Sequence, residues 1–592
     1  MSGELILKIV PQWCMRLGIA WKISMLDMKK NTPHNKFKKG LEVQMFEGRF
    51  LRGSRCSRVS MHAIGVCLAA GVVLPAGAME IDTGIEGFTG RFDNTLRYNL
   101  GTRIDGRDRR IGNNANSDEG DYKFDKGDIV TNRLDLLSEL ELDWQEKVGM
   151  RLSGSAWYDQ AYDDDDVKKN PAIAGPTSYD NNKYSNYTKR YYNGLSGEIL
   201  DAFAYTNFTV AERPVNVKAG RHVVYWGTSI FSQAGISYSQ HPIDGQKSAA
   251  SPGIETRETF MPLTQISMQS QVTDTLSLAA QYYLDWDHIR VPQGGTFLGS
   301  TDFLMEGPDR FGGNTPLANF RADDPLGPNH KSGNWGVAAK LTVPQLNATT
   351  FGLYYREFDE KNGFWVFREP ENPTQFRAVF PRDTKLIGLS MDTSIGPYAV
   401  GAELMTRRNA GLSSVGLSTA NEGARGNTWH ALVNTIFSLP NTPLYDTATM
   451  VAEVSYDYLE KVTDNEALFN SEDNSRVCPL GKDSGCATRD AVGFNISLTP
   501  QYLQVFPGVD LSVPMTLGGG IRGNTADFGG TSEDLYTYSA GLQADFRKQM
   551  TASLIFADSS AEIRRNGSTY YGAGTWQTTD RGRVTLTLKT TF

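Results

Sequence analysis

The residue types best suited to chemistry gather in one long segment, 225–263, which interrupts an otherwise alternating pattern of apolar and polar residues. Ser239, His241 and Asp244 are the residue types of a nucleophilic hydrolase, but closeness in sequence does not establish the geometry of a catalytic triad. We therefore expect no enzyme activity, with lipid hydrolysis at these three residues as the least favoured alternative. We also expect no metal site and no cofactor, because no two histidines downstream of residue 78 stand at metal-ligand spacing: His222, His241, His288, His330 and His430.

A second set of residues in and beside this segment is suited to contacting a solute inside an enclosure. Trp226, Ile230 and Phe231 offer apolar contacts, and the charged members would set the local electric field. Arg221 shares the parity of its apolar neighbours, so a bulge at Gly220 is needed to turn its side chain to the other face. The candidate contact residues are Arg221, Trp226, Phe231, His241, Asp244, Lys247, Glu255, Arg257 and Glu258.

The enclosure itself is predicted from residues 581–592, whose two faces differ completely. Val584, Leu586 and Leu588 fall on one face of an extended strand, while Arg583 and Thr585 fall on the other. About ten residues with this alternation can cross a bilayer at a tilt, whereas the alternative is an edge strand of a soluble β-sandwich. The same pattern predicts a transmembrane antiparallel β-barrel of about 18 strands, with 16 as the lower bound. The predicted strands are 91–104, 133–144, 149–158, 198–210, 214–224, 264–272, 275–286, 334–343, 348–358, 384–393, 397–407, 428–438, 447–459, 491–502, 509–518, 536–546, 549–558 and 581–592.

The connections between these strands alternate without a break between short turns and long loops. Outer-membrane barrels have this arrangement, with short periplasmic turns and long extracellular loops, so both ends of the barrel are expected in the periplasm. The mean hydropathy of -0.38 agrees, because alternating strands hide half of their residues in a polar lumen. Aromatic residues near the strand ends predict two interfacial girdles: Trp144, Tyr398 and Tyr502 at one, and Tyr158, Trp286, Trp335, Trp429, Tyr458 and Phe556 at the other.

The first 78 residues differ in charge from the rest. They carry 12 Lys and Arg against 4 Asp and Glu, which leaves 47 basic and 63 acidic residues downstream. A basic stretch, the apolar run Met61–Pro75 and the small residues 76–78 predict a secretory signal cleaved after Ala78. Residues 1–78 are thus an N-terminal extension plus signal, in which the leader is unusually long or translation starts at Met28 or Met45. Residues 79–592 are predicted to form the barrel in the bacterial outer membrane.

Two loops carry further features. Cys478 and Cys486, eight positions apart, predict a disulfide that closes a loop in an oxidising compartment, and a metal pair is the alternative. The acidic run Asp163–Asp166 could bridge to lipopolysaccharide through divalent cations, and nearby tyrosines could stack on sugars; a solvated loop is the alternative for both. Those tyrosines are Tyr179, Tyr184, Tyr187, Tyr191 and Tyr192.

The order of short motifs around segment 225–263 resembles the signature region of a proteobacterial family catalogued as domain of unknown function 1302. The motifs are Gly220-Arg221, Trp226-Gly227, His241-Pro242-Ile243-Asp244, Pro252-Gly253, Glu258 and Met261-Pro262-Leu263. The resemblance continues through Trp286, residues 510–514 and the C-terminus, so it covers the predicted mature chain. It implies an outer-membrane barrel that accompanies envelope lipoproteins and lipid-type inner-membrane transport pumps, and therefore hydrophobic cargo. Phe592 resembles the terminal Phe through which the barrel assembly machinery recognises its substrates.

We therefore predict an outer-membrane channel or transporter for hydrophobic or amphipathic small molecules. A barrel of about 18 strands encloses water, so selectivity requires a constriction, for which segment 225–263 is the candidate. An ordinary extracellular loop is the alternative for that segment, and a general diffusion porin or structural surface protein is the alternative for the whole chain. About a dozen residues between Ala78 and the first strand are too few for an N-terminal plug domain. The expected surroundings are outer-membrane lipid and lipopolysaccharide, and the acidic mature chain excludes nucleic acid.

Overall fold

The computed structural model describes residues 79–592 except 83, 233, 252, 305, 311–317, 322–331, 374 and 417, so the predicted leader and cleavage site lie outside the described residues. The chain forms a closed antiparallel barrel of 18 strands, in which β19 and β20 together make one crossing. The wall consists of β2 (Phe88–Arg103), β3 (Ile129–Trp144), β4 (Val148–Asp159), β5 (Gly194–Val210), β6 (Arg213–His222), β7 (Leu263–Gln271), β8 (Leu276–Tyr283), β10 (Trp335–Val343), β11 (Thr349–Phe358), β14 (Thr384–Ile395), β15 (Tyr398–Gly411), β16 (Arg425–Leu439), β17 (Thr447–Asp464), β18 (Asp490–Phe506), β19 (Val509–Ser512), β20 (Met515–Arg522), β21 (Tyr536–Phe546), β22 (Met550–Ser560) and β25 (Arg583–Thr591).

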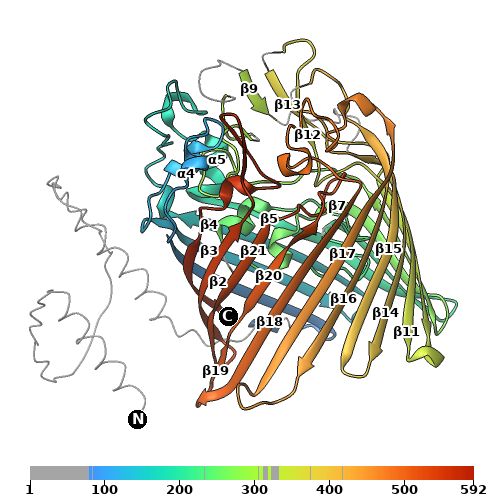
Figure 1. Ribbon diagram of the computed structural model, residues 1–592. Helices are drawn as coiled ribbons and strands as arrows, with labels where there is room; N and C mark the ends of the chain where they lie inside the picture. Colours follow the sequence, from blue (N-terminus) through green and yellow to red (C-terminus); the bar gives the residue numbers. More distant parts are fainter. Residues whose placement is uncertain are drawn as a thin grey trace, which may run out of the picture. The chain divides into compact units, whose positions relative to one another are not determined.

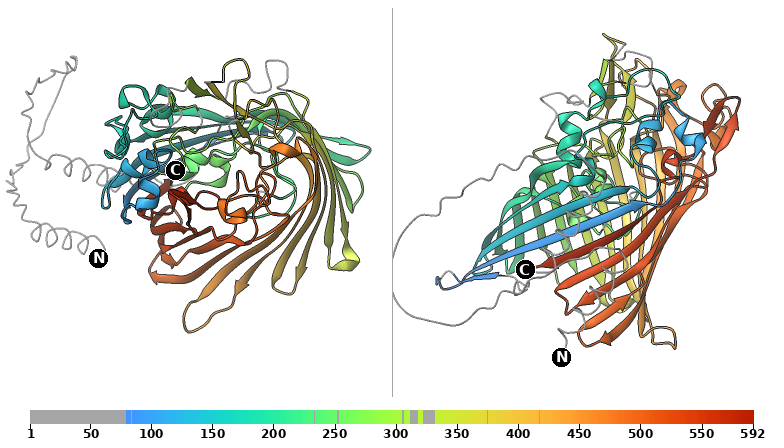
Figure 2. Two further views of the ribbon diagram at one scale, coloured as in Figure 1. Left: turned by 45° about the horizontal axis from the view of Figure 1, so that its top comes forward. Right: turned by 90° about the vertical axis from the view of Figure 1, so that its left-hand side faces the viewer.

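The barrel closes where the last strand pairs with the first. Leu96 lies opposite Thr590 and Tyr98 opposite Leu588 in the pairing of β2 with β25, and β25 also pairs with β22. The right-hand view of Figure 2 shows the blue strand near the N-terminus of the barrel beside the red C-terminal strand. The short strand β1 (Met79–Asp82) pairs antiparallel with the part of β2 that extends beyond the end of β25. The closure predicted from the terminal strand is thus confirmed.

The two faces of the wall carry opposite kinds of side chain. Leucines at lipid-facing positions are exposed, for example Leu353 at 54 % and Leu389. Large charged side chains at the alternating positions, such as Arg97 at 1 % and Arg407, are buried inside the barrel. An apolar outer face and a polar inner face follow from alternation in a wall that separates lipid from an enclosed polar space. None of the helices in the described ranges is long and apolar enough to cross a membrane.

The short and long connections separate to opposite ends of the barrel, here called the turn end and the loop end (Figure 1). At the turn end, Gln145-Glu146, Ala211-Glu212 and Arg547-Lys548 have positive φ at both residues. Two successive left-handed residues are the backbone of a type I′ hairpin turn, whose twist matches that of the flanking strands.

The long connections form a layer with its own secondary structure. A small sheet combines β9 (Ala318–Arg321), β12 (Trp365–Arg368) and β13 (Gln375–Val379), and β23 (Arg564–Asn566) pairs with β24 (Thr569–Tyr571). The α-helices are α3 (Arg109–Gly112), α4 (Asp118–Tyr122), α5 (Asn186–Tyr192), α6 (Gly245–Ala250) and α7 (Thr256–Thr259). The 3-10 turns are Gln160–Tyr162, Asp180–Asn182, Pro344–Leu346, Glu466–Leu468, Gly481–Ser484 and Trp576–Thr578. Short strands of three to five residues lack the bilayer-length alternation from which the wall strands were predicted.

The tyrosines predicted to face solvent or sugars are packed inward instead. Tyr179, Tyr184, Tyr191 and Tyr192 are buried in one cluster with Trp157 of β4. Burial of these large aromatic rings removes them from water and stabilises the loop layer. The expectation of exposed rings is therefore wrong for these four.

The neighbouring acidic run is largely paired with lysines. Asp164 contacts Lys123 at 2.7 Å, Asp165 contacts Lys189 at 2.9 Å, and Asp166 contacts Lys183 at 2.6 Å. Because each of these carboxylates already has a cation, the run does not present a free cluster for a divalent ion.

Two further expectations can be compared with the loop end. Trp286 was predicted in an interfacial girdle, but it is 6 % exposed and packs edge-on against Phe380, with ring centroids 5.2 Å apart. A disulfide joins Cys478 and Cys486 in the connection between β17 and β18, and Asn524 donates a hydrogen bond of 2.9 Å to the Cys486 carbonyl. The disulfide thereby lies against the connection that follows β20.

A luminal segment held by both sides of the wall

Residues 225–263, here called the luminal segment, connect β6 to β7 and contain α6 and α7. Two local signals shape it. The Asp244 carboxylate accepts a hydrogen bond of 2.8 Å from the Lys247 backbone and caps α6, and Glu255 with Glu258 forms a capping box on α7. These caps let two short helices form inside the segment, and several of its other backbone groups bond to side chains of the wall.

The first half of the luminal segment surrounds two buried carboxylates of the wall. Glu403 of β15 accepts backbone hydrogen bonds from Thr228, from Ser229 at 2.9 Å and from Ile236 at 2.7 Å. Glu453 of β17 likewise accepts from the backbone N–H groups of residues 230, 231 and 232, at 2.7 Å for the first. Hydrogen bonds to an ionised acceptor are stronger than neutral ones, so these two side chains are the main anchors of this half.

Cationic side chains hold the carbonyl groups of the same stretch. Arg356 of β11 donates to the carbonyls of Ile236 at 2.9 Å and Tyr238 at 2.6 Å, and Arg407 of β15 donates to that of Ala234 at 2.8 Å. The Arg407 guanidinium also lies 3.6 Å from the centre of the Tyr238 ring, a cation–π contact. Side chains of β11, β15 and β17 thus bind both backbone N–H groups and backbone carbonyls of this half of the segment.

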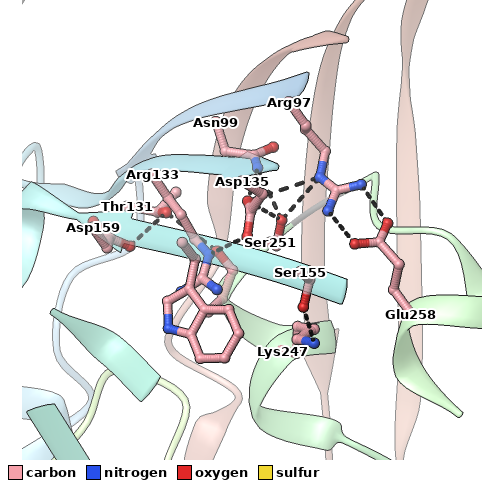
Figure 3. Close-up of polar contacts among 12 residues, drawn as sticks. Arg97, Asn99, Thr131, Arg133, Asp135, Ser155, Asp159, Lys247, Ser251 and Glu258 are labelled. Atoms are coloured by element: carbon pink, nitrogen blue, oxygen red, sulfur yellow. Dashed lines mark hydrogen bonds and ion pairs between the residues drawn. The ribbon is translucent and has the colours of Figure 1, made fainter. Parts of the chain in front are cut away.

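The second half of the segment is fixed to β2 and β3 on the other side (Figure 3). Arg97 makes a two-fold contact with Glu258, at 2.9 Å and 3.1 Å, in which both side chains are buried. Ser251 donates to Asp135 at 2.7 Å and accepts from Arg97 and Asn99, each at 3.1 Å. A bidentate arginine–carboxylate pair fixes orientation as well as distance, so α7 has one position against this wall.

A third group of charges joins the segment to β4 and β5. Lys247 contacts Glu198 and donates to Ser155 at 3.0 Å (Figure 3), while Arg290 bridges Glu198 and Asp244 at 2.8 Å each. Towards the turn end, Glu255 is paired with Lys589 of β25 and Arg257 with Glu139 of β3. The pairing with Lys589 and Arg257 outweighs partial burial and lowers the pKa of Glu255.

The charged candidates within the luminal segment all serve as anchors. Asp244, Lys247, Glu255, Arg257 and Glu258 all lie in the luminal segment and are used to hold it to the wall.

Among the apolar candidates, Trp226 is buried in a cluster with Tyr354, whereas Phe231 and Ile230 are each 38 % exposed. Phe231 and Ile230 are the apolar side chains left to meet a solute.

His241 is buried, and its ring centre lies 3.9 Å from that of Phe260. Burial lowers the pKa of His241 to about 3, so the ring is neutral at physiological pH. Ser239 Oγ accepts from the Lys361 backbone at 2.6 Å and Asp244 is paired with Arg290. Among the described residues, no hydrogen bond joins Ser239, His241 and Asp244 into a triad, and no cluster of three His, Cys, Asp or Glu side chains could hold a metal ion.

Arg221 does not join the luminal contacts. It lies opposite Ala202 of β5 and Thr264 of β7, and the register runs through Gly220 in both pairings without a shift. Neither pairing therefore contains the bulge that would turn Arg221 inward, although Gly220 does adopt φ +125°, a conformation that favours glycine. Arg221 keeps the parity of its apolar neighbours.

The strongest anchors were missed by the sequence prediction. Glu403, Glu453, Arg356 and Glu198 contact the luminal segment but were not among the candidate residues. One signal was present: each is a charge within a predicted strand, and Glu403 and Glu453 lie near the middle of theirs, where a position on the polar face demands a partner within the lumen.

Several solved bacterial outer-membrane channels are similar to the chain at low identity. Pseudomonas aeruginosa OpdK with vanillate is 10 % identical, with a TM-score of 0.36, covering 85 % of this chain and 98 % of that one. Acinetobacter baumannii DcaP is 11 % identical, with a TM-score of 0.34, covering 87 % and 100 %. Acinetobacter baumannii OccAB2 is 9 % identical, with a TM-score of 0.38, covering 85 % and 98 %.

No curated protein is close enough to the chain to count as a match. The family model of the protein of unknown function DUF1302 matches residues 59–592, which is nearly the whole chain and includes every wall strand. The resemblance seen in the motifs around residues 220–263 is thus confirmed, and the chain belongs to the DUF1302 family.

Proposed function

We propose that the protein is an outer-membrane channel for hydrophobic or amphipathic small molecules, with the luminal segment as its constriction. One observation carries this proposal: charged side chains from well-separated strands, β2 and β3 on one side and β15 and β17 on the other, hold a single segment between them. A segment anchored from both sides reduces the free cross-section of the lumen, which is what a selective channel of this width requires.

The hydrophobic cargo is the less supported part of the proposal. Its structural support is the exposure of Ile230 and Phe231 on the segment. The family resemblance adds a second reason, because it implies lipid-type pumps and envelope lipoproteins as companions. The loop end would face outward, with lipopolysaccharide around it, and Phe592 would be the element recognised by the barrel assembly machinery. Envelope lipoproteins and an inner-membrane lipid-type pump are the proposed partners.

The experiment compares single-channel currents of the wild type and of the double variant Glu403→Gln/Glu453→Gln in planar bilayers. Each substitution removes a charge from three backbone N–H groups and costs about 1–3 kcal/mol of anchoring. We expect small wild-type currents and larger, noisier currents in the variant. Asp545→Asn is the matched control, because Asp545 is a wall carboxylate of β21 that bonds Thr551 of β22 rather than the segment.

The outcomes separate the alternatives. A large, steady and weakly selective wild-type current would indicate a general diffusion porin and contradict the constriction. Complete absence of current from correctly folded protein would favour a structural surface protein. Uptake of lipids, sterols and aromatic compounds by wild-type and deletion strains tests the cargo, and equal uptake of all three classes by both strains would contradict it.

A further inference from the structure

The luminal segment does not cover the whole inner wall. Its hydrogen bonds and ion pairs reach β17 on one flank, through Glu453, and β25 on the other, through Lys589. Between these flanks lie β18 to β22, and none of the described residues of the segment has a hydrogen bond or ion pair with them. The wall therefore has one arc that the segment leaves free.

Burial along the strands shows the same asymmetry. β21 and β22 are the wall strands in which no described residue is buried. On the neighbouring β25, by contrast, the inward-facing Thr585 and Thr587 are 2 % and 5 % exposed. Ser553 of β22 lies directly opposite Thr587 in the pairing of the two strands, yet it is only partly buried. The boundary between the covered and the uncovered wall therefore falls between the paired strands β25 and β22.

At mid-height the free arc presents uncharged side chains to the lumen, and the carboxylates Asp510 and Asp545 lie opposite each other nearer the turn end. Leu517, Leu542 and Leu554 are exposed on its lipid face, so the alternating residues face inward. These inward residues include Thr516, Thr537, Ser539, Gln543, Ser553 and Ile555. Thr516 and Thr537 are exposed, and the Thr516 and Ser539 hydroxyls lie 2.7 Å apart. Hydroxyl and amide groups donate and accept hydrogen bonds without creating a field that selects ions.

We propose that solutes cross the lumen along the inner face of β20, β21 and β22, and that this route admits uncharged molecules able to form hydrogen bonds while contacting Ile555. The inference rests on the proposed channel function. It follows from the placement of charge: the segment pairs the ionised side chains of the covered wall, as Arg97 with Glu258 and Lys589 with Glu255, while the free arc has neutral groups at mid-height. A charged solute on this route would lose hydration without finding a partner.

The test uses single cysteines at matched positions in the channel without the predicted leader 1–78, which holds Cys14, Cys56 and Cys67. Ser553→Cys and Ser539→Cys place a thiol on the free arc, and Thr587→Cys places one on the covered wall at the height of Ser553. Cys478 and Cys486 are joined in a disulfide, so neither competes for a thiol reagent. An uncharged, hydrophilic methanethiosulfonate reagent is added while single-channel current is recorded, and labelling is measured by mass spectrometry.

We expect Ser553→Cys and Ser539→Cys to be labelled quickly with loss of most of the current, and Thr587→Cys to keep its current. Vesicle swelling should be faster with glucose than with gluconate, a carboxylate of similar size. Equal labelling of positions 553 and 587, block only at 587, or faster entry of gluconate would overturn the route. If the wild type gives no current, the channel proposal fails, whereas selective labelling of position 553 would still show that the arc is open.

Discussion

A buried charge on the inner wall depends on a partner that the chain supplies from far away in sequence. Arg97 is 1 % exposed, and its two-fold partner Glu258 belongs to the luminal segment. Removing one member of such a pair leaves the other as an uncompensated charge, which costs more than the pair contributes in net stability. The anchors are therefore more sensitive to loss of one partner than to loss of both.

This asymmetry gives a prediction for Glu258→Gln. The variant leaves Arg97 with Asp135, whose carboxylate is 3.8 Å away, as its remaining ionic partner. We expect the free energy of unfolding in phospholipid vesicles, measured with urea, to fall by about 3–5 kcal/mol. The double variant Arg97→Met/Glu258→Met should recover a large part of that loss.

The control for this prediction is the exposed pair Arg213–Asp274 at the turn end. Asp274→Asn should leave the unfolding midpoint unchanged, since water replaces the lost partner of an exposed charge. A loss in Asp274→Asn comparable to that in Glu258→Gln would show that burial is not the cause.

At the scale of elements, the wall strands could be predicted and the contacts of the luminal segment could not. Every predicted strand range overlaps a wall strand, because one-sided burial in lipid imposes a period of two that short sequence windows reveal. The range 509–518 is divided into β19 and β20, and Pro514 at the break cannot donate a ladder hydrogen bond. Sequence periodicity shows the wall but not how a strand is interrupted.

The luminal segment was predicted only as a departure from that period. Its position depends on contacts such as Ile230 with Glu453, which are 223 residues apart, and no local pattern encodes a pairing at that distance. The buried tyrosines of the connection between β4 and β5 show the same limit. The composition of this connection suggests solvent exposure, while the tyrosines are buried in a cluster that includes Phe297 from another connection.

Helix α4 at the loop end gives a prediction for pH. Burial is the main cause that raises the pKa of Glu119 to about 8, hydrogen bonds from Ser178 oppose the shift, and the Asp118 carboxylate adds to it. The unfolded chain releases this proton near the ordinary glutamate value of 4.5, so the folded state holds more protons between that pH and about 8. Stability of the loop end should therefore fall as pH rises through this window and level off above it.

Glu119→Gln should flatten this dependence, because the amide stays neutral at every pH while keeping an oxygen for the Ser178 backbone. Hydrogen exchange of α4 and residues 177–180, corrected for intrinsic rates at about pH 5 and about pH 8, measures the effect. Glu371→Gln, at an exposed site, should leave the slope as in the wild type. An equal slope in Glu119→Gln would assign the pH dependence to other groups, with Asp302 the next to test.

At the scale of the whole molecule, the closed wall depends on a single pairing between residues almost 500 positions apart. The Thr95 and Thr591 hydroxyls face each other across that seam at 3.1 Å, with a sequence separation of 496. Thr95→Cys/Thr591→Cys should therefore form a disulfide on mild oxidation, since directly opposed residues of antiparallel strands lie within disulfide reach.

The cross-link should change the mobility of the denatured chain in non-reducing electrophoresis and leave the channel current intact. Thr95→Cys/Thr587→Cys is the control, because Thr587 lies opposite Asn99 and is out of register with Thr95. Efficient cross-linking of the control pair would mean that the seam slides, and no cross-link in either pair would mean that the barrel is open there.

The strand β2 holds both ends of the barrel at once. Met79 lies opposite Phe92, and Phe592 exchanges backbone hydrogen bonds of 2.7 Å and 2.9 Å with Asn94. Because both ends lie beside the same strand, a few linking residues could join them. A new pair of ends could then be opened at Gly567, between β23 and β24. Such a circularly permuted chain would keep every wall pairing but carry Phe592 inside the sequence. It would therefore separate closure of the wall from the proposed recognition of a terminal Phe by the assembly machinery.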